Sequence, residues 1–310
     1  MMSIDPHHPL IIDNISALLN STIDLTNLLF KLTDYDGIQY VISGQNTDSL
    51  CFTVLAPQLA SVGEAGGYES IQLNYPGFPI AIDEGSYSIL IDRSQLPDPS
   101  LGEERKLRAN DIANKFSMFR THFLSGPFIK ALKNVKSGTA FQPKEVLIRP
   151  NEKLWVIPGE NRVNFIFQVN FSDHTDGSLS RVFLQEFVEA KRQVPNSPVI
   201  TFSQNPPEAM SMFKGATLPS TIGFLCITVL KEQIRQEAET GQWLAGLKQY
   251  LTYHLHACKT YLHMRMRKKT EGLLKVLKNA VPDKLEEKTF RRVRAAKTRR
   301  EESKIVYNFN

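Results

Sequence analysis

Cysteine is scarce in this sequence, which has three in 310 residues: Cys51, Cys226 and Cys258. They are far apart and lie in apolar stretches of the kind that forms strands or helices. Their spacing is not that of a disulfide framework in a small secreted protein. We therefore expect three buried, reduced thiols, which are typical of the cytosol.

Long hydrophobic runs are also absent. No segment approaches the roughly 18 uninterrupted apolar residues of a membrane-spanning helix. The stretch MMSIDPHHPLII at the start lacks the basic region followed by an apolar run that directs secretion. With 42% hydrophobic residues, the composition is that of a globular protein. We expect a cytoplasmic protein that does not insert into membranes.

The sequence also lacks a recognisable catalytic motif. The glycine-rich stretch 63–67, GEAGG, has no P-loop lysine followed by serine or threonine, and no GxSxG motif presents a serine nucleophile. Adjacent carboxylates at 103–104 and 286–287 are typical of a solvated surface. We therefore predict no catalytic residues and no cofactor, and we favour a binding or scaffolding protein over an enzyme.

Candidate metal ligands occur in three places, but none has suitable spacing. Residues 34–45 begin like a calcium loop, yet Gln45 stands where the last glutamate of such a loop belongs. Residues 173–179 are better explained as a polar turn. His254 and His256 would point about 200° apart on a helix, whereas helical metal pairs are four residues apart. We predict no metal site.

Charge is present but unevenly placed. The net charge is +5, yet residues 259–304 contain 16 Lys and Arg against 6 Asp and Glu, a net of +10. The other 264 residues carry 21 against 26, a net of −5. Such a positive block implies an acidic partner. Nucleic acid, an anionic membrane and an acidic protein surface all fit.

Residues 247–280 predict one long helix whose second face changes character midway. At about 100° per residue, one apolar stripe runs along it and comprises Leu251, Leu255, Leu262, Met266, Leu273, Leu277 and Ala280. Nearly opposite, in the first half, lies an aromatic stripe of Trp243, Gly246, Tyr250, Ala257, Tyr261 and Met264. From Arg267 onward this second side is a basic arc of Arg267, Lys268, Lys275 and Lys278 with Glu271. Pro282 ends the pattern.

Two interpretations of this helix remain open. In the first, the aromatic stripe belongs to the intramolecular core and the basic arc is merely solvated. In the second, a partner subunit covers the aromatic stripe, because a helix that is apolar on two sides has to be covered on two sides. The basic arc is then an electrostatic docking surface.

The order of elements favours an α+β fold with two tandem, sandwich-like domains, mainly antiparallel sheets and a long C-terminal helix. In the first half we expect a helix over 10–31 with a possible break near 20–22, a hairpin over 32–43, strands over 49–56 and 87–93, and a variable loop over 61–85. A further helix is expected over 101–132, broken at Gly126 and Pro127. In the second half we expect strands over 145–150, 153–159, 162–171, 197–210 and 221–230 and a helix over 180–194. The predicted domains are 1–135 and 144–283, the second ending in a helix of about 241–281, with a basic tail over 284–310.

Three segments carry a resemblance to a known family. They are YLTYHLHACKTYLHMRMRKKTEGLLKVLKNAVPD at 250–283, RVFLQEFVEAKR at 181–192 and FSQNPPE at 202–208, with weaker agreement through TDYDGIQYVIS, YSILIDRSQLP and RPNEKLWVIPGENRVNFIF. The sequence resembles the second-subunit family of the actin-related protein 2/3 complex, the larger of its two paired scaffold subunits.

The resemblance implies a non-catalytic scaffold in the cytoplasm and cytoskeleton. In that family the long helix lies beside its counterpart in subunit 4, and the pair forms a core that holds the two actin-related proteins. The pair also contacts the side of the mother actin filament during branched nucleation. No small-molecule substrate, cofactor or nucleic acid is implied.

The resemblance and the helix pattern together imply two sets of site residues. The expected partner-subunit interface is Trp243, Tyr250, Tyr253, Tyr261 and Met264. The expected filament contacts are Lys191, Arg192, Arg267, Lys268, Lys275 and Lys278. Because an exposed ion pair contributes only about 0.2 to 1 kcal/mol, several of these cations have to act together.

Two segments depart from the family pattern. Residues 231–242, KEQIRQEAETGQ, are more acidic than the proline-rich and basic turn of the family, and the tail over 284–310 is longer and unusually basic. The alternative function is therefore a nucleic-acid-binding protein, or an anionic-membrane adaptor, that uses this tail. Phe290 is the only aromatic residue among its cations before Tyr307, which weakens the first option, and its few apolar positions weaken the second.

Overall fold

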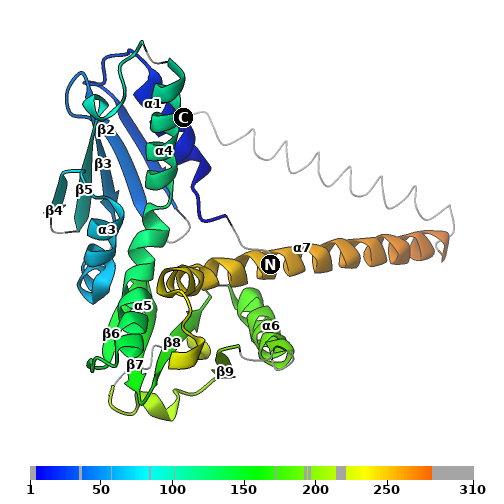
Figure 1. The fold of residues 1–310 in the computed structure, drawn as a ribbon. Helices are drawn as coiled ribbons and strands as arrows, with labels where there is room; N and C mark the ends of the chain where they lie inside the picture. Colours follow the sequence, from blue (N-terminus) through cyan, green and yellow to red (C-terminus); the bar gives the residue numbers. More distant parts are fainter. Residues whose placement is uncertain are drawn as a thin grey trace, which may run out of the picture. The chain divides into compact units, whose positions relative to one another are not determined.

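The computed structural model describes residues 5–34, 37–56, 58–83, 85–100, 102–171, 173–191, 194, 197–213 and 221–280 (Figure 1). Contacts divide the chain into two compact units, 1–255 and 256–310. The first unit contains two five-stranded sheets. The described part of the second unit is the distal portion of one helix.

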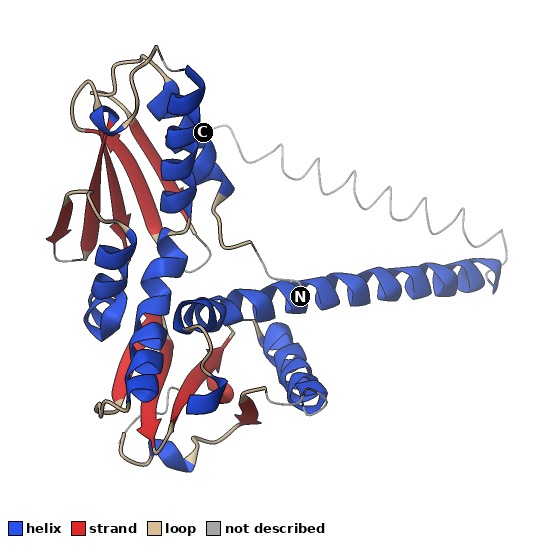
Figure 2. Ribbon diagram, viewed as in Figure 1, coloured by secondary structure: helices blue, strands red, loops and turns tan. Residues whose placement is uncertain are grey.

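The first sheet and its helices occupy residues 9–137. In chain order they are α1 (Pro9–Asn20), β1 (Leu29–Thr33), β2 (Gln39–Gly44), β3 (Ser49–Leu55), α2 (Leu59–Val62), a π-helical turn (Gly63–Gly67), α3 (Tyr68–Asn74), β4 (Ile80–Asp83), β5 (Ser86–Asp92), α4 (Gly102–Ser117) and α5 (Phe119–Ser137). The strand order is β1-β2-β3-β5-β4, and every pairing is antiparallel. Figure 2 shows α1 and α4 side by side along this sheet.

The second sheet repeats this layout. It comprises β6 (Lys144–Arg149), β7 (Glu152–Gly159), β8 (Arg162–Asn170), α6 (His174–Lys191), β9 (Val199–Ser203), β10 (Thr221–Leu230) and α7 (Glu237–Ala280). Its order, β6-β7-β8-β10-β9, matches the first sheet position by position, and all pairings are antiparallel. In both halves a helical connection leads from the third strand to an edge strand. The predicted α+β fold with antiparallel sheets and a long C-terminal helix is confirmed, whereas the predicted domain limits stay a prediction.

Strand patterning explains how each sheet is covered. In β5 the buried residues alternate, so Tyr87, Ile89 and Ile91 face the core and their neighbours are partly exposed. In β7, by contrast, Leu154 through Ile157 are all buried. The second face of this sheet is covered by a small cluster of Trp155, Ile157, Ile166, Met210 and Phe224. A strand buried on both faces loses the alternation.

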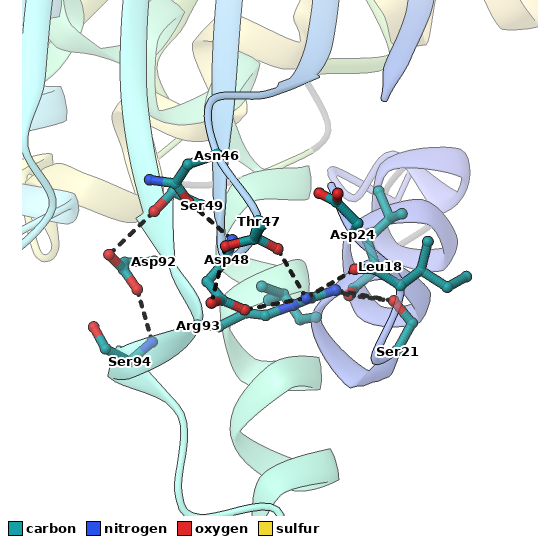
Figure 3. A network of polar contacts seen from close by, with 12 residues as sticks. Leu18, Ser21, Asp24, Asn46, Thr47, Asp48, Ser49, Asp92, Arg93 and Ser94 are labelled. Atoms are coloured by element: carbon teal, nitrogen blue, oxygen red, sulfur yellow. Dashed lines mark hydrogen bonds and ion pairs between the residues drawn. The ribbon is translucent and has the colours of Figure 1, made fainter. Parts of the chain in front are cut away.

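The helix expected over 10–31 does break near 20–22, as the sequence suggested, but its second half is wrong. It ends at Asn20, and residues 29–33 form strand β1, paired with β2. The guanidinium of Arg93 helps to end it, because it donates to the carbonyl of Leu18 at 2.9 Å and to the Ser21 hydroxyl at 3.1 Å (Figure 3). Carbonyls in the last turn of a helix need such donors.

The variable loop expected over 61–85 is also wrong. The segment holds α2, the π-helical turn, α3 and β4. Gly66, at φ 133°, touches Gly126 of α5, where an added Cβ would meet the backbone carbonyl of Gly66 at 2.5 Å. These glycines permit close helix packing and do not mark a loop. The helix break expected at Gly126 and Pro127 is also in the wrong place. The two helices α4 and α5 meet at Met118, and Pro127 lies inside α5.

Two further expectations need correction. The turn predicted over 173–179 is the start of α6, because the Asp173 carboxylate accepts the backbone N–H groups of Thr175 and Asp176 and so caps the helix. Of the three cysteines only Cys51 is buried. Cys226 is half-buried and Cys258 is exposed on α7.

Candidate association surface on the long helix

The long helix α7 is anchored at its start by α5. Glu237 in its first turn pairs with Lys136 at 2.7 Å, and the hydrogen bond from Lys136 lowers the pKa of that carboxyl. An acid at this position also suits the positive end of the helix dipole. Gly241 packs on Ile129 so closely that a Cβ would lie 2.5 Å from its side chain.

Within the first unit, one face of α7 is buried. Leu244, Leu247, Leu251 and Leu255 are each at most 3% exposed. Their spacing of three and four residues defines a single helix face. This buried face contains the first part of the leucine stripe, and no described residue after Leu255 is buried.

The aromatic stripe in the same part of the helix is only partly covered. Trp243 is 36% exposed and Tyr250 is half-buried, and Tyr253, which lies beside the stripe in the expected interface, is 60% exposed. The Tyr250 ring lies 4.3 Å from that of His254, which stacks on Phe183 of α6 at 6.1 Å and 10°. The first interpretation placed this stripe in the intramolecular core. The exposure of Trp243 and Tyr253 argues against that interpretation.

In the described part of the distal unit, residues of both stripes of α7 are exposed. Tyr261 is 55% and Met264 is 60% exposed, and Arg265 lies over the Tyr261 ring at 5.6 Å. The exposed apolar side chains from the leucine stripe and beside it are Leu262, Met266, Leu273, Leu274, Val276 and Leu277. Large contiguous apolar areas of this kind mark interaction sites.

The expected filament contacts are located as follows. Arg267, Lys268, Lys275 and Lys278 are all exposed on α7. Lys191 is the last residue of α6. Arg192 and the basic tail over 284–310 lie outside the described residues. The contact of these six cations with a filament stays a prediction. The role of the aromatic stripe as a partner interface stays one as well.

The described residues were also searched for metal-binding groups, membrane-spanning helices and cavities. They contain no group of three His, Cys, Asp or Glu residues that could hold a metal ion, and none of their helices is long and apolar enough to cross a membrane. A cavity of about 280 Å³ lies between α3, α5 and the start of α7. The two carboxylates of its lining are paired, Glu69 with Lys130 and Glu237 with Lys136, and the lining holds neither histidine nor cysteine.

The sequence analysis missed one polar network beneath α7. Lys248 pairs with Glu152 at 2.5 Å, and Glu152 faces Arg149 at 3.6 Å. The available signal was a lysine within the leucine stripe, four residues after Leu244 and three before Leu251. The partner carboxylate is 96 residues away and could not be identified from local pattern.

The sequence of this chain matches one protein family and several known proteins. The family model described as the Arp2/3 complex 34 kD subunit, p34-Arc, matches residues 54–284. The chain is 26% identical over 289 residues to the actin-related protein 2/3 complex subunit 2 of Dictyostelium discoideum, covering 91% of this chain and 94% of the relative. It is 28% identical over 287 residues to the protein of the same name from Schizosaccharomyces pombe, covering 83% and 88%. The family match includes the whole second sheet and all of α7.

Proposed function

Because the chain belongs to the family of the 34 kD Arp2/3 complex subunit, p34-Arc, we propose that it is a non-catalytic scaffold subunit of such a complex, in the cytoplasm and on the actin cytoskeleton. Both relatives described above are named subunit 2 of that complex. One observation supports an associating role most directly: α7 leaves an aromatic stripe and an apolar stripe exposed within the described residues.

The finer proposal is that α7 pairs with subunit 4 and that the pair holds the two actin-related proteins. Its interface comprises Trp243, Tyr250, Tyr253, Tyr261 and Met264. Aromatic side chains and methionine are enriched at the centre of protein interfaces, where they bury much area with few rotatable bonds. Burying them on a partner removes from water the apolar surface that the chain alone exposes.

The cations are proposed to contact the mother filament. Arg267, Lys268, Lys275 and Lys278 share one arc of α7, and Lys191, the last residue of α6, precedes Arg192 in the sequence. A single surface cation binds weakly. A group of them raises the association rate with an acidic surface and makes binding depend on salt. We therefore expect a multipoint, salt-sensitive contact.

One purification tests the scaffold role. The full-length chain carries an affinity tag at its N-terminus and is captured from its own cell extract at physiological salt. Co-purification of two actin-related proteins and a subunit 4 homologue supports the proposal. Capture of RNA or lipid without them would instead support the alternative based on the basic tail.

A further inference from the structure

We infer that Lys248 is a positioning residue that determines which face of α7 packs on the second sheet. The first part of α7 is apolar on two sides, with leucines on one and aromatic residues on the other. Hydrophobic burial alone therefore distinguishes the two faces poorly. A polar group that is satisfied in only one orientation removes the ambiguity.

The contacts of Lys248 are specific to the observed orientation. Its Nζ donates to the Glu152 carboxylate at 2.5 Å and to the Asn170 carbonyl at 2.8 Å. The same ammonium lies 3.9 Å from the centre of the Phe171 ring. The Lys248 side chain is 17% exposed, and these groups supply the anion, the neutral acceptor and the aromatic face that satisfy a largely buried ammonium.

The receiving side of this contact is built into the sheet. Glu152 begins β7 and is 6% exposed, and Arg149 ends β6 directly opposite it. Arg149 also donates to the carbonyl of Ala245 in α7 at 3.5 Å. A buried carboxylate with cations on two sides needs both of them, because removing one leaves charge uncompensated.

The position of Lys248 on the helix supports a role in orientation. It lies four residues after Leu244, three before Leu251 and seven before Leu255, at the centre of the buried face. Apolar residues in place of the whole network of Lys248, Glu152 and Arg149 would add to the apolar contact, and such replacements of complete buried ion pairs are often neutral or stabilising. A lysine at this site is therefore better explained by specificity than by stability.

The opposite orientation would separate the pair. Turning α7 by about half a rotation would place Trp243 and Tyr250 against the sheet and move Lys248 toward solvent. Glu152 would then remain buried without its lysine. The observed orientation instead keeps Tyr253 accessible, so Lys248 determines which surface the helix offers to other molecules.

The test measures which face of α7 is accessible in the full-length chain. A thiol probe is introduced as Leu251→Cys on the buried face or as Tyr253→Cys on the exposed face, with Cys258→Ser to remove the exposed native thiol. Reaction with a maleimide reagent is followed with Lys248, with Lys248→Met and with Glu152→Gln. A chain without either probe corrects for Cys51 and Cys226. Lys106→Met, at an exposed lysine of α4, is the matched control.

With Lys248 present we expect Tyr253→Cys to react fast and Leu251→Cys slowly. In Lys248→Met, and likewise in Glu152→Gln, Leu251→Cys should react about tenfold faster as the second orientation becomes populated, and Tyr253→Cys should react more slowly. Lys248→Arg keeps the cation and should restore the original pattern, and Lys106→Met should not change it. The helical circular dichroism signal should be retained throughout.

Unchanged probe reactivity in a folded Lys248→Met chain would overturn the inference. If that variant loses its helical signal, the Glu152→Gln chain decides, because glutamine keeps the shape and removes only the charge. Loss of folding in both variants also overturns it, since the pair would then serve stability and not orientation. The measurement involves neither actin nor another subunit. If the inference about Lys248 fails, the proposed function is therefore unaffected.

Discussion

The Nδ1 atom of His122 lies 3.2 Å from the hydroxyl oxygen of Tyr75, in a buried cluster that joins α5 to the end of α3. Burial, with a smaller contribution from the charge of Lys115, lowers the pKa of His122 from 6.5 to about 4. The folded chain therefore keeps this imidazole neutral at pH values where the unfolded chain protonates it.

The sign of the pH effect follows from this difference. Stability from neutral His122 is complete above pH 6.5 and is lost as the pH falls from 6.5 toward 4, by up to about 3 kcal/mol. Urea unfolding of the full-length chain at pH 7.0 and 5.0 measures the loss. His122→Gln should flatten the dependence between these values, because the carboxylates with lowered pKa, such as Asp92, titrate at lower pH. An equally steep loss in His122→Gln would assign the effect to other groups.

Arg93 provides a second prediction about stability. Its side chain is 8% exposed, and its guanidinium donates to the carbonyls of Leu18 and Thr47 (Figure 3). It also donates to the carbonyl of Ile23. Arg93→Lys cannot reach all of them and should lower the free energy of unfolding by about 2 to 3 kcal/mol. Urea unfolding measures this loss.

The ion pair of Arg93 with Asp48 serves as the control for that measurement. The Asp48 side chain is 67% exposed, so Asp48→Asn should cost less than about 1 kcal/mol. If Asp48→Asn costs as much as Arg93→Lys, the charge pair holds this corner of the fold and the carbonyl contacts do not.

The contact of α5 with the π-helical turn yields a third prediction. A Cβ at Gly126 would lie 2.5 Å from backbone atoms of Gly66, which cannot move independently of the turn. Gly126→Ala should therefore destabilise the chain by about 1 to 3 kcal/mol, as overpacking does. Gly246→Ala is the matched control, because nothing lies within 4 Å of its added Cβ. It should be neutral, or stabilising by up to about 1 kcal/mol. Gly126→Ala should lower the thermal unfolding temperature and Gly246→Ala should not. A similar decrease in both variants would contradict the packing argument.

Local pattern was sufficient for the strands and for the long helix. Alternation in residues 86–92 and the run of apolar residues in β7 and β8 placed both sheets, and a three- and four-residue period placed α7 within a few residues of its ends. These patterns of apolar residues lie within short stretches of the sequence, so they can be recognised without the contacts that the stretch makes with the rest of the chain.

The errors come from contacts between distant residues. The glycines at 63–67 indicated a loop, but Gly66 meets Gly126 sixty residues later, so packing and not turn geometry explains it. The sequence likewise predicted two faces on α7 but not which of them the sheet covers. That choice involves Glu152 and Asn170, far from Lys248 along the chain.

The aromatic stripe leads to a fourth prediction, on assembly. Tyr261→Ala combined with Met264→Ala should lower recovery of subunit 4 with the tagged chain at least about tenfold, because aromatic and methionine anchors carry much of the energy of an interface. Both side chains are more than half exposed, so the thermal unfolding of the chain itself should not change. Val182→Ala removes a side chain of similar exposure from α6 and is the control. Full recovery of subunit 4 with the double variant would remove these residues from the interface.

The basic arc of α7 leads to the last prediction. Charge reversal at Lys268, Lys275 and Lys278 should weaken co-sedimentation of the assembled complex with actin filaments about tenfold or more at physiological salt, because three attractive contacts become repulsive. Assembly should be unaffected, since these side chains are exposed and lie on the side of α7 away from the leucines. Raising the salt should shrink the difference between variant and parent, as Coulombic contacts are screened. Lys106→Glu on α4 changes a comparably exposed lysine and should bind normally. Equal binding by the triple variant at physiological salt would place the filament contact elsewhere on the complex.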